Sequence, residues 1–463
     1  IRDRGKSVND SIPKTTHMEI ASIQDIDRRI KQCYAQTGEV WMAKADVKAA
    51  YRTQPVRPED WQLQGIKWQG KYYIDTRMSF GCRSSVDQWL RMSKALSHAL
   101  TRWGVRHVTY IDDFIFIASS QKECEEQVRR FKTICSDWNV ILKDEKDAGP
   151  SQRITVLGID YDLVNMTRRI TAKRLNSIKE DLTAARTTNN RRHWEHLAGV
   201  LWFVSPCVPK ATPYTYSISN AAARARHASR AILKTPNVQA ALDWWIHFTT
   251  TISDPSTAWH GQQIIQTRQR DVHICMGDAG SEYGMGGFDN EHFFSAKWPT
   301  DMWKAVQRRK GPSSLHMETL QLLVAARALG HTWSGTDVLM RLDCLALVDT
   351  LRKGYHQHEP INAAIQELTD LQIKHNFALK PAWVRRCYNE AADALSKNDM
   401  PRFWSNIHGD RTMILLEKHH LALPQCNGIR NHSQKTCKPK PTPPVTMETK
   451  PPADGDVGVQ QRR

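Results

Sequence analysis

Two adjacent carboxylates, Asp112 and Asp113, lie within the stretch His107–Ile117, between two short apolar runs that favour β-structure. The alternating apolar side chains on each side predict two strands joined by a tight hairpin connection. Adjacent carboxylates repel each other, and inside a core they require a cation, which a divalent metal ion would supply. Turns also tolerate aspartate, so a solvated loop tip is the alternative interpretation of this stretch.

A third carboxylate, Asp46, ends a predicted strand that covers residues 40–47. An acid at a strand end, facing an acidic hairpin, is the usual way to build a metal site from three carboxylates. The residues that follow, Lys48–Arg52, predict a turn. An aspartate that caps a helical turn is therefore the alternative interpretation of Asp46.

The elements around these acids are predicted from hydrophobic periodicity. A helical pattern runs through Ile20–Ile30, and a β-rich segment at residues 61–76 ends in a break around Gly81, where a ligand can approach the backbone closely. Further along we expect helices at 86–103 and 121–138 and a strand at 155–161. A β-rich core that carries three aspartates and is interrupted by helices is the outline of a polymerase palm.

Five motifs in residues 1–160 occur in the order and at the spacing found in reverse transcriptases, and this part of the chain resembles their fingers and palm. Asp46 followed by Tyr51 is similar to the first motif, and Phe80-Gly81 is similar to the second. Tyr110-Ile111-Asp112-Asp113 fits the specific Tyr-x-Asp-Asp form of the third motif. Lys146 resembles the fourth motif, and Val156-Leu157-Gly158 resembles the fifth.

This resemblance implies a site with two Mg²⁺ or Mn²⁺ ions. Its metal ligands would be the carboxylates of Asp46, Asp112 and Asp113 and the backbone carbonyl of Val47. The residues implied to contact substrates are Val47, Tyr51, Phe80, Gly81, Arg83, Tyr110, Lys146 and Gly158. Among them, Tyr51 would lie under the deoxyribose, and Lys146 would act as the acid toward the leaving pyrophosphate.

The match to this family begins late in the fingers, so we expect partial fingers and a chain cut from a longer protein. Residues 161–265 are expected to form a thumb and a connection. The helical run from Thr171 to about Leu201 is rich in Lys and Arg, which contact phosphates of a duplex without reading its sequence. A solvated helix face is the alternative, and the charges alone do not decide.

A second group of acids begins with Asp278, the last residue of a predicted strand at 272–278. Beyond it, Gly284, Gly286 and Gly287 predict hairpin turns. In the next helix, apolar residues at spacings of three and four form a stripe that Glu318 interrupts. A carboxylate on a buried face is unfavourable unless it is paired or bound to metal; the alternative is a position at the edge of the stripe.

Two further acids complete this group. Asp343 ends a predicted strand at 338–343, and Asp393 lies in the first turn of a helix that Asn389 is expected to cap. Four acids on three β/α elements can converge on two metal ions.

Residues 266–405 resemble the ribonuclease H domain, whose four catalytic, metal-binding acids correspond to Asp278, Glu318, Asp343 and Asp393. The resemblance implies two Mg²⁺ ions that activate water against the RNA strand of a hybrid. One departure is the segment Val384–Tyr388, which replaces a longer His-bearing loop that many members carry before the last acid. The role of that loop is therefore in doubt for this chain.

The composition suits a nucleic-acid partner. The chain has 463 residues, a formal net charge of +17 and 16 Trp, and its isoelectric point is about 9.4. A basic surface of this kind binds polyanions, and a basic protein on a membrane surface is the alternative. No apolar run approaches the ~20 residues that span a bilayer, so we expect a soluble protein with no membrane partner.

The ten cysteines are scattered, with no Cys-x-x-Cys pair. This pattern argues against a disulfide framework and for reduced thiols in an intracellular protein of the cytoplasm or nucleus. A zinc site can be assembled on paper near the C-terminus, but its spacing matches no usual finger. Its residues would be His419, His420, Cys426, His432 and Cys437. The composition of residues 406–463 predicts a disordered, basic, Pro-rich tail.

The sequence thus predicts an α+β multidomain protein: a right-hand polymerase with fingers, palm and thumb, followed by an α/β ribonuclease H-like domain. The expected function is an RNA-directed DNA polymerase with ribonuclease H activity. Ser7–Asp10 and Asp343-Cys344 make it most like the polyprotein of DIRS-type retrotransposons.

The expected partners are an RNA template, a DNA primer, an RNA–DNA hybrid and dNTPs, and the oligomeric state is left open. One alternative is a non-enzymatic, nucleic-acid-binding remnant of a retroelement polyprotein. Another is an RNA-dependent RNA polymerase, which would share the palm but has no need of a domain that degrades hybrids.

Overall fold

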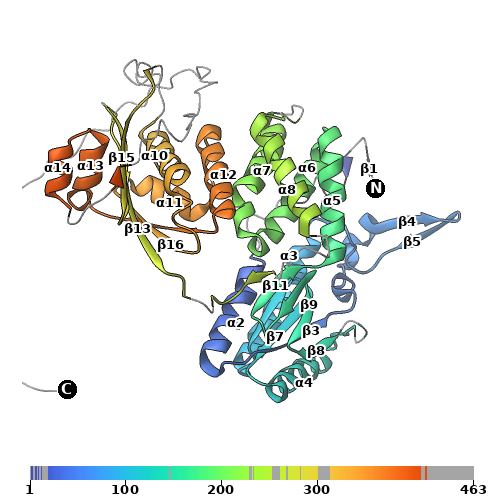
Figure 1. Cartoon of the computed structure of the whole chain (residues 1–463). Helices are drawn as coiled ribbons and strands as arrows, with labels where there is room; N and C mark the ends of the chain where they lie inside the picture. Colours follow the sequence, from blue (N-terminus) through green and yellow to red (C-terminus); the bar gives the residue numbers. More distant parts are fainter. Residues whose placement is uncertain are drawn as a thin grey trace, which may run out of the picture. The chain divides into compact units, whose positions relative to one another are not determined.

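The computed structural model shows a mixture of helices and sheets (Figure 1). It describes residues 2–3, 6–7, 9, 12, 19–143, 145, 147–228, 232, 234–252, 261–266, 269–281, 283–300, 313–407 and 412–413. The chain divides into two units, Ile1–Leu423 and Pro424–Arg463, and all the described residues belong to the first. Several predictions fall outside the described residues: Lys146, part of Ser7–Asp10, the suggested zinc site and the tail from residue 414 onward.

The first three aspartates lie on a four-stranded sheet with the order β6-β7-β3-β8, which we call the N-terminal sheet. Its strands are β3 (Trp41–Asp46), β6 (His107–Tyr110), β7 (Asp113–Ala118) and β8 (Ala148–Ser151). Strand β7 pairs in antiparallel fashion with both β6 and β3. The hairpin predicted around Asp112 is therefore confirmed.

Strand β7 is buried on both faces, because its side chains alternate between two hydrophobic clusters. Phe114 and Phe116 belong to one cluster, with helices α3 (Ser85–Arg102) and α4 (Gln121–Asp137). Ile115 and Ile117 belong to the other, with helix α2 (Ile23–Thr37). A strand enclosed in this way has a strongly specified register, because a slip of one residue would exchange the two faces.

A second sheet has the order β12-β11-β10-β9. Its strands are β9 (Arg153–Val156), β10 (Ile159–Asp162), β11 (Thr167–Ile170) and β12 (Gln262–Gln263). The single strand predicted at residues 155–161 is wrong, because the chain reverses at Leu157 and Gly158. Both residues have positive φ, +53° and +73°, as a tight hairpin turn requires. Sequence analysis did not predict this turn because Leu157 occupies a turn position where Asn or Asp is usual.

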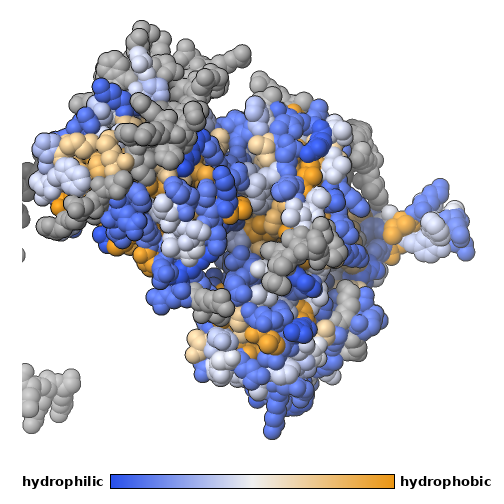
Figure 2. All heavy atoms as spheres, in the orientation of Figure 1, coloured by the Kyte–Doolittle hydropathy of each residue, from blue (hydrophilic) through white to orange (hydrophobic). Residues whose placement is uncertain are grey.

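A hairpin formed by β4 (Gly65–Trp68) and β5 (Lys71–Ile74) projects outward from the neighbouring elements (Figure 1). Its side chains are exposed on both faces, including the rings of Trp68 and Tyr72 at 64% and 79%. Hydrophilic and hydrophobic residues are mixed on its surface (Figure 2). Outside this hairpin, hydrophilic residues cover much of the visible face.

Four α-helices lie between β11 and β12 in the chain: α5 (Ala172–Thr187), α6 (Arg191–Val204), α7 (Thr212–Ala228) and α8 (Pro236–Ile252). The predicted helical run from Thr171 to Leu201 is thus divided in two. Asn190 begins the second helix, because its side-chain oxygen accepts a hydrogen bond from the N–H of Arg192 at 3.0 Å. Trp194 and Trp245 are fully buried between the helices.

The second group of acids lies on a six-stranded sheet with the order β17-β16-β13-β14-β15-β18, which we call the C-terminal sheet. Its strands are β13 (Val272–Ala279), β14 (Gly284–Phe288), β15 (His292–Lys297), β16 (Asp337–Leu342), β17 (Ala378–Trp383) and β18 (Thr412–Met413). Strands β13, β14 and β15 form an antiparallel meander, and β16 and β17 continue from β13 in parallel.

Two helices cover opposite faces of this sheet, α10 (Ser314–Leu329) and α13 (Glu390–Ser396) (Figure 1). The prediction that Gly284, Gly286 and Gly287 mark turns is wrong, because all three lie within β14. A Cβ at Gly286 would lie 2.3 Å from the Cβ of Leu395 on α13, and a Cβ at Gly287 would lie 2.9 Å from Gln321 on α10. Gly286 and Gly287 are therefore required for close helix–sheet packing rather than for turns, whereas a Cβ at Gly284 would collide with the backbone of Ala296 on β15.

The remaining helices are α11 (Leu345–Lys353), α12 (Glu359–Lys374) and α14 (Met400–Ser405). Helix α12 contacts α7 through buried polar groups. The amide of Asn362 donates hydrogen bonds to the carbonyl of Pro213 and the hydroxyl of Ser217, each at 3.0 Å. The hydroxyl of Tyr214 donates to the carboxylate of Asp370 at 2.6 Å. The C-terminal sheet and the four-helix region are thus joined by a hydrogen-bonded interface.

The described cysteines are all free thiols. None of the helices in the described ranges has both the length and the apolar character that crossing a membrane requires.

Candidate active sites

The first site is built by the pairing of β3 with β7. Asp46, the last residue of β3, is the direct partner of Asp113, the first residue of β7. Asp113 is also paired with Tyr110 across the β6–β7 turn. Asp112 lies in that turn, and its carbonyl oxygen accepts a hydrogen bond from the N–H of Val47 at 3.2 Å. The fold thus brings together the three aspartates that the sequence singled out.

The turn that carries Asp112 is held by a residue that sequence analysis missed. Ile111 has a φ of +55°, in the left-handed region, which is costly for a β-branched residue. The indole N–H of the fully buried Trp89, on α3, donates a hydrogen bond to the carbonyl of Ile111 at 2.8 Å. No local sequence signal links Trp89 to this turn, because the contact arises only when α3 packs on the sheet.

Tyr51 and Phe80 form an aromatic pair beside the first site. Their ring centroids are 5.2 Å apart, in an edge-to-face arrangement. Burial, with a smaller contribution from the charge of Asp112, raises the pKa of the Tyr51 phenol. Tyr51 therefore lies near Asp112, while Phe80 is 69% exposed. Contact of these rings with a nucleotide stays a prediction.

Gly81 and Arg83 are held by the N-terminal segment. The side-chain amide of Asn9 donates a hydrogen bond to the carbonyl of Gly81 at 2.7 Å, and its oxygen accepts one from the N–H of Arg83 at 2.7 Å. The Arg83 guanidinium donates to the carbonyl of Ile12 at 2.8 Å. Arg83 thus braces the N-terminal segment, and its expected contact with the template stays a prediction.

Tyr110 and Gly158 meet the helical region through Phe203 and Arg174. The rings of Tyr110 and Phe203 are 6.0 Å apart between centroids, and the Arg174 guanidinium lies 4.8 Å from the centroid of Phe203. A Cβ at Gly158 would lie 2.6 Å from Nε of Arg174 and would displace this guanidinium, and the positive φ of +73° itself favours glycine at this position. Arg174 belongs to the basic run noted in the sequence, but only the fold shows its contact with Gly158.

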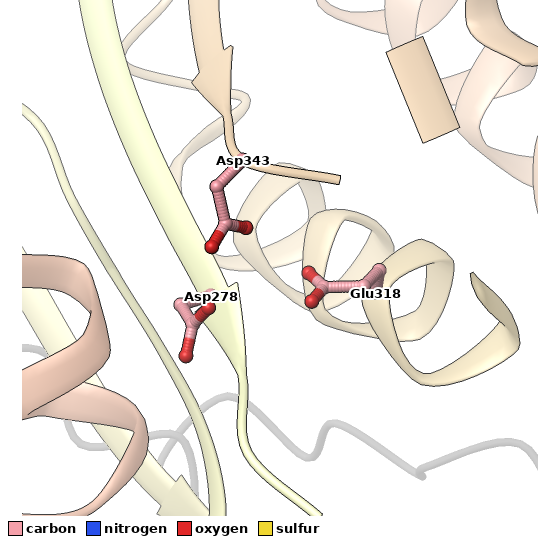
Figure 3. Close-up of side chains that lie close together, drawn as sticks. All are labelled: Asp278, Glu318 and Asp343. Carbon is pink, nitrogen blue, oxygen red and sulfur yellow. The ribbon is translucent and has the colours of Figure 1, made fainter. Parts of the chain in front are cut away.

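The second site lies where two parallel strands of the C-terminal sheet end. Met276 on β13 is the register partner of Arg341 on β16, so Asp278 and Asp343, two residues beyond them, emerge at the same edge. Glu318 is contributed by α10, which packs on β13. One carboxylate oxygen from each of these three acids lies within 4.8 Å of the other two. Figure 3 shows the three side chains gathered at one place.

We call Asp278, Glu318 and Asp343 the acid cluster. Its carboxylate oxygens are unusually close together. Among the described residues, no other group of three or more acidic, His or Cys side chains lies within 4.8 Å of one another. Asp393 and the three aspartates of the first site therefore do not reach this spacing.

The electrostatics of the acid cluster reflect burial and mutual repulsion. Burial, followed by the charges of Asp278 and Asp343, raises the pKa of Glu318 to about 9. Burial is also the main cause that raises the pKa values of Asp278 and Asp343. Without a cation, Glu318 therefore retains a proton at neutral pH.

The residues of the acid cluster fit a divalent cation. Glu318 is only 8% exposed, and its Oε2 is buried without a hydrogen-bond partner. Such an orphaned oxygen is unfavourable unless a ligand satisfies it. A donor set made only of carboxylate oxygens suits Mg²⁺ or Mn²⁺. A cation here would also offset the repulsion that keeps Glu318 protonated.

Asp393, the fourth acid predicted for this site, is surrounded by three cationic side chains. It accepts hydrogen bonds from Arg386 at 3.2 Å, from Lys397 at 2.8 Å and from Arg402 at 3.0 Å. Burial acts to raise the pKa of Asp393, but the hydrogen bonds from Lys397 and Arg386 outweigh it, and the pKa is lowered. Asp393 is therefore ionised although it is 5% exposed. Sequence analysis identified Asp393 but not its three partners.

Two buried polar residues, one in α13 and one just before it, connect this helix to β13, the strand that carries Asp278. The hydroxyl of Ser396 lies 2.6 Å from the carboxylate of Asp278, to which it donates a hydrogen bond. Asn389 precedes the helix, as predicted, but its side chain does not cap it. Instead its amide donates to the carbonyl of Gly277 on β13 at 3.2 Å. The capping prediction for Asn389 is therefore wrong, because the side chain bonds across to the sheet.

Comparison with known proteins relates the N-terminal part to one family. Residues 4–161 match the family described as reverse transcriptase (RNA-dependent DNA polymerase). This part of the chain is similar to reverse transcriptase domains. The match contains the whole Asp46–Asp113 pairing and ends before the acid cluster. The predicted palm motifs thus lie within the matched residues, whereas the ribonuclease H resemblance lies outside them.

Among solved structures, the chain is similar to a foamy viral protease–reverse transcriptase in complex with double-stranded DNA. That match has 13% identity and a TM-score of 0.40, and it covers 81% of this chain and 61% of that chain. A foamy viral protease–reverse transcriptase in complex with an RNA/DNA hybrid matches with 11% identity, a TM-score of 0.37, and coverage of 85% and 70%. No curated protein matches the chain.

We predict that the ion-free protein loses stability as pH rises, because of Glu318. Its folded-state pKa of about 9 exceeds the ordinary 4.5, so between these values the unfolded state has lost a proton that the folded state retains. The resulting decrease in the free energy of unfolding is largest at high pH, and at pH 7 it is at most about 3 kcal/mol. Glu318→Gln should therefore raise the melting temperature in EDTA at pH 8 and flatten its dependence on pH.

The measurement is thermal unfolding from pH 5 to 9 in EDTA and in Mn²⁺. Mn²⁺ should raise the melting temperature of the wild type more than that of Glu318→Gln. The matched control is Glu180→Gln, on the exposed face of α5, which should behave as the wild type. A Glu318→Gln variant with an unchanged pH profile and an unchanged response to Mn²⁺ would show that Glu318 neither has a raised pKa in the ion-free protein nor binds the cation.

Proposed function

We propose that the chain is an RNA-directed DNA polymerase joined to a ribonuclease H. The observation that carries the polymerase part is the direct pairing of Asp46 with Asp113, next to the Asp112 turn, within the residues that are similar to reverse transcriptase domains. The observation that carries the nuclease part is the acid cluster at the edge of a mixed sheet. The two sets of acids belong to different sheets, which supports two separate reactions.

In the polymerase site, Asp46, Asp112, Asp113 and the carbonyl of Val47 would hold two divalent ions. When bound, these ions would lower the pKa of the primer 3′-hydroxyl and neutralise charge on the triphosphate. The protein's own contribution is to fix the carboxylates: the β3–β7 register sets Asp46 against Asp113, and the Trp89 bond holds the turn that carries Asp112. Tyr51 and Phe80 would contact the incoming nucleotide, with Lys146 toward the pyrophosphate.

In the nuclease site, Asp278, Glu318, Asp343 and Asp393 would hold two divalent ions. Bound ions of this kind activate a water molecule for attack on a phosphodiester. Ser396 orients Asp278, and Asn389 ties α13 to β13, so the chain itself sets the positions of two of the acids. The substrate would be the RNA strand of the hybrid that the polymerase site produces. The retroelement origin belongs to this same proposal and rests on the sequence resemblance.

We predict that the two activities are separable. Asp112→Asn should reduce primer extension on an RNA template by about a hundredfold or more and leave hybrid cleavage intact, because each metal site loses only its own ligand. Glu318→Gln should have the reverse effect. The measurements are dNTP incorporation on an RNA template and cleavage of a labelled RNA–DNA hybrid, both with Mg²⁺.

The controls are Asp137→Asn on α4 and Glu180→Gln on α5, two exposed acids that should leave both activities unchanged. Circular dichroism should show that every variant is folded. Loss of both activities in either Asp112→Asn or Glu318→Gln would contradict the assignment of two sites. A wild-type chain without either activity would favour the non-enzymatic alternative.

We also predict that Tyr51 selects deoxyribonucleotides. Its ring lies beside Asp112 and packs edge-to-face on Phe80, which would place an aromatic face under the sugar and leave no room for a 2′-hydroxyl. Tyr51→Val should raise kcat/KM for ribonucleotides selectively, because it relieves a steric clash. The measurement is the ratio of dNTP to NTP incorporation. An unchanged ratio in a variant that still polymerises would make Tyr51 a packing residue.

A further inference from the structure

Arg386 contacts an acid of the second site although its own side chain is largely exposed to solvent. It lies in the short segment Arg386–Tyr388 between β17 and α13. Its guanidinium donates a hydrogen bond to the carboxylate of Asp393, yet its side chain is 76% exposed. A guanidinium has five N–H donors, so most of them face solvent rather than protein. Arg386 is thus anchored to an acid of the site and open to a ligand.

The three cations around Asp393 are not equivalent. Lys397 lies one turn farther along α13, and Arg402 comes from α14. The side chain of Arg386 is 76% exposed, compared with 46% for Lys397 and 40% for Arg402. Arg402 also lies 3.9 Å from the carboxylate of Glu390. The positive charge of Arg386 acts on Asp278, Glu318 and Asp343, so Arg386 is the cation of the three that is both open to a ligand and coupled to the acid cluster.

A nucleic-acid strand at the acid cluster meets an electrostatic obstacle. The carboxylates that would bind metal repel the phosphate that has to approach them, and a cation at the rim offsets this repulsion. The segment around Arg386 also exposes two aromatic rings, Trp383 at 47% and Tyr388 at 71%. The indole N–H of Trp383 donates to the carbonyl of Asp343 at 3.0 Å, which fixes its ring beside the cluster. Basic and aromatic side chains together are typical of surfaces that contact single strands.

We propose that Arg386 binds a phosphate of the RNA strand beside the scissile bond, and that the same guanidinium holds Asp393 while no nucleic acid is bound. This inference rests on the proposed ribonuclease H function. Guanidinium matches the geometry of phosphate by donating two parallel hydrogen bonds. Transfer of Arg386 to the phosphate leaves Lys397 and Arg402 on Asp393, so this carboxylate remains ionised and becomes accessible on one side. Arg386 thus competes with a metal ion in the free protein and assists the substrate in the complex.

Two opposite effects follow for Arg386→Gln. Removal of the positive charge should tighten the binding of Mn²⁺ alone about threefold to fivefold, the size of one exposed charge interaction. It should also slow single-turnover cleavage of an RNA–DNA hybrid about tenfold at saturating Mn²⁺, because a charge-assisted contact to phosphate is lost. Arg386→Lys retains the charge but not the planar fork. It should bind Mn²⁺ as the wild type does and still cleave more slowly.

The experiment uses the full chain with Asp112→Asn added throughout, so that the polymerase site contributes less to metal binding. Free Mn²⁺ is followed by electron paramagnetic resonance without nucleic acid, and cleavage is followed with a labelled hybrid. The matched control is Arg385→Gln, which removes an exposed charge from the adjacent position. It should change Mn²⁺ binding and cleavage far less than Arg386→Gln does.

Each outcome decides the inference. Tighter Mn²⁺ binding together with slower cleavage supports it. A loss of both would mean that Arg386 only maintains the structure around Asp393, and tighter Mn²⁺ binding with unchanged cleavage would remove its role toward phosphate; either result overturns the inference. If Arg386→Gln equals Arg385→Gln while the parent cleaves hybrid, the inference fails and the proposed function stands. A parent chain that does not cleave hybrid overturns both.

Discussion

Repulsion between carboxylates held at strand ends is the constraint on which both sites depend. Asp46 faces Asp113 because β3 and β7 pair in one register, and Asp278 emerges beside Asp343 because β13 and β16 pair in another. Neither arrangement favours the ion-free protein, so rigid surroundings must hold it. Strand β7 supplies that rigidity in the N-terminal sheet, since Phe114 and its neighbours are buried on both faces.

The C-terminal sheet meets the same constraint with close packing and countercharge. Gly277 lets α10 approach, since a Cβ there would lie 2.3 Å from the side chain of Gln321, one turn beyond Glu318. In the ion-free state, the buried acids are stabilised in two ways. Burial and repulsion leave a proton on Glu318, whereas Asp393 remains charged because three cations contact it. Under the proposed function, divalent ions would replace both arrangements.

Sequence analysis singled out the acids because they interrupt a regular pattern or lie at the end of a predicted element. Asp112 divides two apolar strands, and Glu318 breaks an apolar helical stripe. It failed where a contact between distant segments decides the structure. Leu157 adopts a turn conformation that is unusual for leucine, and Gly286 and Gly287 of β14 allow helix packing rather than turns. The partners of Asp393 were missed for the same reason, because Arg402 becomes its neighbour only after α14 folds against α13.

The proposed function requires two independent acid sites for divalent ions. Anomalous X-ray diffraction at the manganese edge, from crystals of the full chain with Mn²⁺ and an RNA–DNA hybrid, locates such ions without relying on activity. We expect one set of peaks among Asp278, Glu318 and Asp343 and another at Asp46, Asp112 and Asp113. Crystals in which Mn²⁺ binds elsewhere, with no peak among Asp278, Glu318 and Asp343, would contradict it.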